Sequence, residues 1–129
     1  MHDETVRRAL SRFDGEVIAR TGDGFVAVFE GAPSRAVRCA VALRAAVAQL
    51  GVEVRLGLHT GECEIIGDGI GGMAVHIASR IGALAQAGEI LVLATTFGTI
   101  VGSGLAFDPR GEHRLKGVPG RWPVFALDA

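Results

Sequence analysis

The stretch EVIARTGDGFVAVF, residues 16–29, decides the class of fold. Residues 16–20 have the character of a strand, the glycine-flanked sequence TGDG at 21–24 has the composition of a tight turn, and residues 25–29 form a return strand of apolar side chains. This pattern predicts a β-hairpin near the start of the chain. Any fold proposed for the rest of the sequence must therefore contain an antiparallel pair of strands.

Helices are expected on both sides of this hairpin. Residues 3–13 have a helical pattern that Asp14-Gly15 ends, and a second helix is expected from Pro33-Ser34 to about Leu50, before Gly51. The remaining expected elements are strands at 53–59 and 62–66 that pair through Thr60-Gly61, a glycine-rich loop at 67–72, a helix at 73–86, a strand at 89–93, a short helix at 94–101 and a hairpin of 105–115 and 121–127 around 116–120. Helices that alternate with hairpins predict one α+β domain over residues 1–129, with a mostly antiparallel sheet.

The composition argues against several classes of partner. The chain has 129 residues with a formal net charge of −1, which offers no basic surface for nucleic acid or an anionic membrane. It has no apolar run of about 18 residues and no signal peptide in its acidic opening, so we expect no membrane segment and a cytoplasmic location. Its two cysteines, Cys39 and Cys63, are expected to be free buried thiols.

Three places carry side chains that could act on a phosphorylated substrate. Asp23, between glycines in the first turn, could reach a hard cation, although an Asp-Gly pair between strands is commonly no more than a turn. His76 and Arg80 are four residues apart and share a helix face, where the arginine needs either a phosphate or a structural ion pair. Lys116, beside Gly117, could meet a triphosphate or simply face solvent.

The order of these motifs resembles the class III adenylyl and guanylyl cyclases. TGDGF, RLGLHTGE, GGMAVHIASR, GEILV and GLAFDPRGEHRLKGVPG follow one another as in that family, from about Val6 to Leu127, and VHIA is typical of a bacterial subgroup. The resemblance implies a ferredoxin-like cyclase homology domain with extra strands and a head-to-tail dimer with active sites across the interface. It also implies conversion of ATP to cyclic AMP and pyrophosphate with Mg²⁺ or Mn²⁺.

The resemblance assigns roles to five residues. Asp23 matches the second metal-binding aspartate, Arg80 the arginine that stabilises the transition state, and Lys116 the phosphate-binding lysine. His76 stands at the position of the family's asparagine, where it can still donate a hydrogen bond. Asp68 lies one residue from the position of the aspartate that reads the base and is a candidate substitute for it.

Two of the family's positions carry residues that cannot perform the family's role. Ala19 stands where the base-reading lysine is expected, and Gly69 where the base-reading aspartate is expected. The family's opening strand, an FTDIVGST-like segment with the first metal aspartate, is expected to be missing, which would leave 25–29 and 53–59 without their shared neighbour and favour an oligomer with an altered sheet. These departures predict little or no activity and weak binding of ATP or another nucleoside triphosphate. The alternative is a non-catalytic dimerisation or regulatory module that pairs with a second copy or another cyclase chain.

Overall fold

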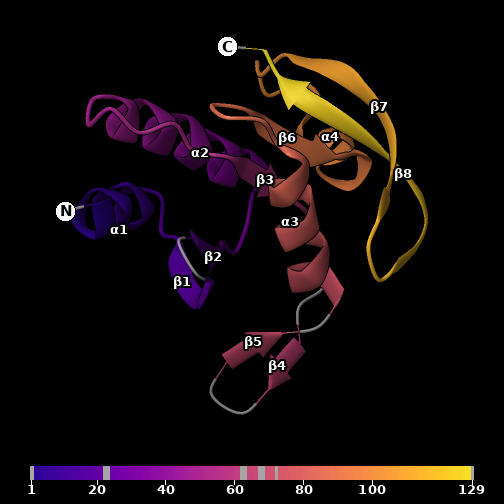
Figure 1. The fold of residues 1–129 in the computed structure, drawn as a ribbon, viewed down its shortest axis with the longest axis horizontal. Coiled ribbons are helices and arrows are strands. Elements are labelled where there is room, and N and C mark those ends of the chain that lie inside the picture. The colour runs from indigo at the N-terminus through magenta and orange to yellow at the C-terminus, as the bar shows by residue number, and fades with distance from the viewer. Residues whose placement is uncertain (1, 22–23, 62–63, 67–68, 72, 129) are drawn as a thin grey trace. The chain divides into compact units, whose positions relative to one another are not determined.

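The computed structural model describes residues 2–21, 24–61, 64–66, 69–71 and 73–128. Asp23, Cys63 and Asp68 lie outside these described residues. The chain divides into two compact units, residues 1–54 and 55–129. Figure 1 labels the helices and strands of both units.

The first unit contains the predicted hairpin between two helices. Its elements are α1 (His2–Arg12), β1 (Glu16–Thr21), β2 (Gly24–Val28) and α2 (Pro33–Ala48). The strands are antiparallel, with Glu16 opposite Val28 and a register shift between Val17 and Ala19. Helices α1 and α2 pack together through buried apolar side chains, namely Ala9, Leu10, Val37, Cys39, Ala40, Leu43 and Val47. Both helices and the hairpin confirm the sequence prediction.

Helix α2 ends slightly earlier than predicted. The helix begins at Pro33, as predicted, but ends at Ala48, and Leu50 beyond it is 39% exposed. Gly51 follows with φ of 79°, in the left-handed region that glycine adopts without strain. Cys39 is a free buried thiol, as expected, and its Sγ lies 3.6 Å from the carbonyl oxygen of Ala9. Burial raises the pKa of the Cys39 thiol.

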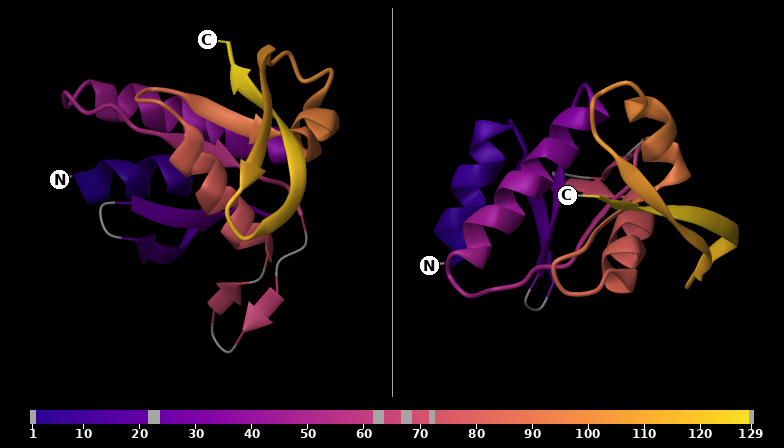
Figure 2. Two further views of the ribbon diagram at one scale, coloured as in Figure 1. Left: turned by 45° about the vertical axis from the view of Figure 1, so that its right-hand side comes forward. Right: turned by 90° about the horizontal axis from the view of Figure 1, so that it is seen from above.

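The second unit is built on a mixed sheet. Its elements are β3 (Leu56–Leu58), β4 (Glu64–Ile66), β5 (Gly69–Gly71), α3 (Met73–Leu84), β6 (Ile90–Leu93), α4 (Ala94–Ile100), β7 (Phe107–Leu115) and β8 (Val118–Leu127). The sheet has the order β3-β6-β8-β7, in which β3 and β6 are parallel and the other pairs are antiparallel. Helix α3 packs on β3 and β6, and α4 packs on β6 and β8 (Figure 2).

The pairing of β3 corrects one sequence prediction. We expected strand 53–59 to pair with 62–66, but β3 spans only Leu56–Leu58 and pairs in parallel with β6, while β4 pairs with β5 inside the expected glycine-rich loop. The parallel arrangement requires α3 to cross close to β3. A Cβ atom on Gly57 would lie 2.2 Å from the backbone nitrogen of Gly82, so this approach is possible only with glycine.

The last hairpin is longer and its turn tighter than the sequence suggested. We expected a five-residue connection at 116–120, but β8 begins at Val118, so that only Lys116 and Gly117 form the turn. Leu115 and Val118, directly before and after this turn, are buried. Both join the core cluster of the unit, which also contains Ile77, Ile81, Ala85, Leu91, Leu93 and Val124.

Candidate functional site

The centre of the candidate site is the contact between α3 and the β7–β8 turn. His76 Nε2 lies 2.8 Å from the carbonyl oxygen of Lys116, forty residues further along the chain. The buried side chains of Ile77 and Leu115, each directly before or after one of these residues, belong to the same core cluster. The core therefore fixes both partners of the hydrogen bond, and the structure brings together two residues that the sequence analysis singled out separately.

Gly117 completes this contact. It has φ of 81°, and a Cβ atom at this position would lie 2.9 Å from His76 Nε2. A larger residue would be strained at this φ and would press on the imidazole. Only glycine lets the helix and the turn approach this closely without a shift of the ring.

Arg80 lies one helical turn beyond His76 and is half-buried. The sequence left open whether this arginine serves a phosphate or a structural ion pair. Within the described ranges, Arg80 has no carboxylate within ion-pair distance, and the same holds for the side chain of Lys116, which is exposed. Neither cationic side chain is thus neutralised by a described carboxylate, and each can bind an anion.

The remaining predicted site residues cannot be placed in the same way. Asp23 and Asp68 lie outside the described residues, although the strands that flank Asp23 form the expected hairpin. Ala19 is in β1 opposite Val26, and Gly69 begins β5 opposite Ile66. Over the ranges that are described, no three His, Cys, Asp or Glu side chains are grouped so that they could hold a metal ion.

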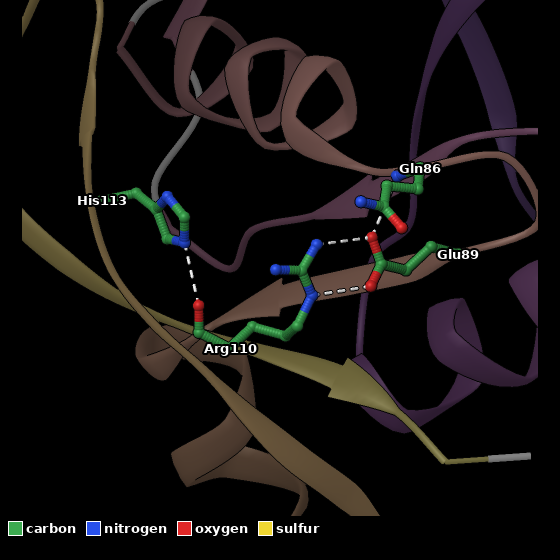
Figure 3. A network of polar contacts seen from close by, with 4 residues as sticks. All are labelled: Gln86, Glu89, Arg110 and His113. Carbon is green, nitrogen blue, oxygen red and sulfur yellow. Dashed lines mark hydrogen bonds and ion pairs between the residues drawn. The ribbon is translucent and has the colours of Figure 1, made fainter.

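A second polar cluster was not predicted from the sequence (Figure 3). Arg110 of β7 donates from Nε to Glu89 Oε2 at 2.7 Å and from Nη2 to Glu89 Oε1 at 2.9 Å. The backbone N–H of Gln86 also donates to Glu89, and His113 Nε2 donates to the carbonyl oxygen of Arg110 at 2.9 Å. The hydrogen bonds from Arg110 lower the pKa of Glu89, and the carboxylate raises the pKa of Arg110. This cluster joins the start of β6 to β7.

Three threonines and a histidine link the segment after β3 to the start of α4, which directly follows β6. His59 Nδ1 lies 2.9 Å from Thr95 Oγ1, and Thr60 Oγ1 lies 3.0 Å from Thr96 Oγ1. Burial lowers the pKa of His59. The motif RLGLHTGE, residues 55–62, contains His59 and Thr60, but nothing in it indicates these partners.

Comparison with known proteins gives a family match over nearly the whole chain. The family model described as "Adenylate and Guanylate cyclase catalytic domain" matches residues 2–129. An uncharacterised protein of Mycobacterium bovis is 35% identical over 124 residues, which cover 91% of this chain and 42% of that protein. A putative adenylate cyclase of Rhizobium meliloti is 30% identical over 124 residues, covering 89% of this chain and 21% of that protein. The chain thus spans less than half the length of these curated relatives.

Solved structures show the same fold. An adenylate/guanylate cyclase/hydrolase from Silicibacter pomeroyi superposes with a TM-score of 0.87 at 24% identity, covering 98% of this chain and 79% of that one. An adenylyl cyclase from P. aeruginosa has a TM-score of 0.84 at 22% identity, with coverage of 99% and 79%. These likenesses confirm the predicted α+β cyclase homology fold. None of the helices in the described part of the chain is long and apolar enough to cross a membrane.

Proposed function

Because the chain belongs to the adenylate and guanylate cyclase catalytic domain family, we propose that it supplies the phosphate-binding half of a class III cyclase site, with little or no turnover by itself. The observation that carries this proposal is the hydrogen bond from His76 to the Lys116 carbonyl, which joins the α3 face that bears Arg80 to the turn that bears Lys116. Arginine and lysine together suit the triphosphate of ATP or another nucleoside triphosphate.

The weak turnover follows from the residues proposed to meet the base. Ala19 and Gly69 have no side-chain donor or acceptor, so they cannot form hydrogen bonds to a purine edge. We propose Asp68, next to Gly69, as a substitute contact and Asp23 as a ligand for Mg²⁺ or Mn²⁺, the ions that the family generally uses. Such an ion would stabilise charge on the phosphates.

A second candidate function is a regulatory module that dimerises without catalysis. The same two positions, Ala19 and Gly69, favour it, because a partner chain with a complete set of residues could perform the chemistry across a dimer interface. Such a partner would be another cyclase chain, whereas a second copy, which has the same two residues, would give a dimer without catalysis. The two candidates differ in one measurable respect, since only the first requires Arg80 and Lys116 to bind phosphate.

The experiment is a cyclase assay with Mn²⁺ and either ATP or GTP, on these 129 residues and on the same chain with an FTDIVGST-like segment fused ahead of residue 1. We expect barely detectable product from the first and more from the second. A turnover of about one per second with Mg-ATP from the first would overturn the proposal of weak activity, since that is an ordinary enzymatic rate.

Phosphate binding is measured separately, by an NMR titration with inorganic tripolyphosphate. We expect Arg80→Ala and Lys116→Ala each to weaken binding about tenfold, because each removes a charged hydrogen-bond donor. Arg7→Ala is the matched control, since it removes the same charge from an exposed position on α1. Equal binding by all four proteins would favour the regulatory module.

A further inference from the structure

We propose that His76 is a positioning residue: its ring holds the Lys116 carbonyl and so fixes the β7–β8 turn from which the Lys116 side chain reaches the phosphates. This inference rests on the proposed function, in which Lys116 binds triphosphate. It departs from the family resemblance, in which the residue at this position donates a hydrogen bond directly to the substrate.

The first argument is the direction of the hydrogen bond. A backbone carbonyl only accepts, so at 2.8 Å the Nε2 atom of His76 must carry the hydrogen and donate it to Lys116. In the neutral ring, Nδ1 is then an acceptor and cannot donate to a phosphate oxygen. The geometry therefore assigns the one donor of the neutral imidazole to the turn.

The second argument is the shape of the turn. Only Lys116 and Gly117 connect β7 to β8, and the residues on either side of them, Leu115 and Val118, are buried. The exposed Lys116 thus lies in a two-residue turn, and the residues on both sides of this turn are held in the core. The peptide group between Lys116 and Gly117 is the part of the turn that the core does not hold. His76 binds this peptide group, and Gly117 leaves space for the ring.

The third argument is reach. Glutamine carries its amide nitrogen about as far from the backbone as Nε2 of histidine, whereas the nitrogen of asparagine lies about one bond closer, near the place of Nδ1. Glutamine at position 76 can therefore keep the contact with the Lys116 carbonyl, and asparagine is too short for it. His76→Gln and His76→Asn are therefore a matched pair of variants of similar polarity that differ in reach.

The test begins without a ligand. We expect His76→Asn and His76→Ala to increase the fast motion of the Lys116, Gly117 and Val118 amides in ¹⁵N relaxation, whereas His76→Gln keeps them ordered as in the wild-type chain. Circular dichroism checks that each variant is folded. An equally ordered turn in all four proteins would overturn the proposal, because His76 would then not hold it.

The second measurement is the affinity for inorganic tripolyphosphate. We expect His76→Asn to weaken it about fivefold, the equivalent of one lost hydrogen bond, and His76→Gln to stay within about twofold. In a chain that also carries Lys116→Ala, the change at position 76 should have no further effect, since it acts through the lysine.

Two outcomes separate this inference from the function on which it rests. If the losses from His76→Ala and Lys116→Ala add in the double variant, His76 contacts the phosphates itself and the positioning role is wrong, while the proposed function stands. If the wild-type chain does not bind tripolyphosphate at all, the proposed function is wrong, and so is the role of His76 in positioning a lysine that binds substrate. The relaxation data would still show whether the histidine orders the turn.

Discussion

The two long hairpins of this chain are held in different ways. The β7–β8 hairpin contributes Leu115, Val118, Val124 and Leu127 to the buried residues of its unit, and His76 binds its turn. In the β1–β2 hairpin, every described side chain is exposed or half-buried, and the register shifts after Val17. The β7–β8 hairpin is therefore anchored by fully buried apolar side chains beside its turn and in the second half of β8, whereas the β1–β2 hairpin has only partial burial.

The difference bears on how each hairpin is prepared for a ligand. Segments with few buried apolar contacts open at lower free energy than segments in the core. The turn that carries Lys116 should thus keep its shape before any ligand binds, whereas the hairpin proposed to carry the metal and base positions should gain order from a ligand or partner. Three substitution experiments test whether the two hairpins differ in this way.

The largest effect is expected from replacing one valine by alanine in each hairpin. Val124 of β8 is 1% exposed and lies in the core cluster, whereas Val26 of β2 is half-buried. Val124→Ala should lower the free energy of unfolding by about 2.5 kcal/mol, through lost burial and the cavity left behind. Val26→Ala should cost roughly 1 kcal/mol or less, since less apolar surface is lost.

Urea denaturation followed by circular dichroism measures both variants. Hydrogen exchange adds the local result, because amides of β1 and β2 should exchange faster than those of β7 and β8 in the wild-type chain. Equal costs for the two valines, with equal protection of the two hairpins, would show that partial burial holds β1 and β2 as firmly as the core holds β7 and β8.

The local patterns of the sequence predicted most of the elements. The apolar return strand after TGDG and Pro33 at the start of α2 each depend on neighbours a few residues away, and such local signals can be detected in a single sequence. The parallel pairing of β3 with β6 joins residues 56–58 to 90–92, and no local pattern contains it. The antiparallel partner expected for β3 was wrong for that reason.

The sequence proposes a set of site residues but does not indicate the contacts that these residues make. The order of motifs singled out His76, Arg80 and Lys116, and the structure joins the first of these to the last. The acceptor in that bond is a backbone carbonyl, which every residue type has, so the sequence contains no sign of it. The pair of Glu89 and Arg110, 21 residues apart, was missed because nothing in either local pattern selects a charged partner at that separation.

An intermediate effect is expected at the tip of the β7–β8 hairpin. Gly117 and Gly120 both have positive φ, 81° and 91°, but only at Gly117 would a Cβ atom meet His76, at 2.9 Å from Nε2. Gly120→Ala should cost about 1 kcal/mol for the strained backbone alone. Gly117→Ala should cost about 2 kcal/mol, since the ring must also give up its hydrogen bond to the Lys116 carbonyl.

The free energy of unfolding is measured for Gly117→Ala and Gly120→Ala, each with and without His76→Ala. These values isolate the contribution of the contact between residue 117 and the His76 ring. The difference between the glycine positions should shrink to near zero once the imidazole is gone. If the difference persists without the ring, the φ strain at Gly117 is simply larger, and the contact with His76 adds nothing to the anchoring of this hairpin.

The smallest effect is expected from the ion pair between β6 and β7. Arg110 lowers the pKa of Glu89, so the carboxylate stabilises the fold above its unfolded pKa, near 4.5, and that stability is lost as the pH falls through the lower folded value. Glu89→Gln should therefore cost about 1 kcal/mol at pH 7, where two charge-assisted hydrogen bonds in a partly exposed pair are weakened, and less at pH 3, because acidification protonates the carboxylate of the wild-type chain. Glu112→Gln removes the same charge from an exposed position on β7 and should change the stability by less than about 0.5 kcal/mol. Urea denaturation of the wild-type chain and of both variants at both pH values measures these costs. If the cost of Glu89→Gln does not fall on acidification, the core alone, and not the charge pair, holds β7 in place.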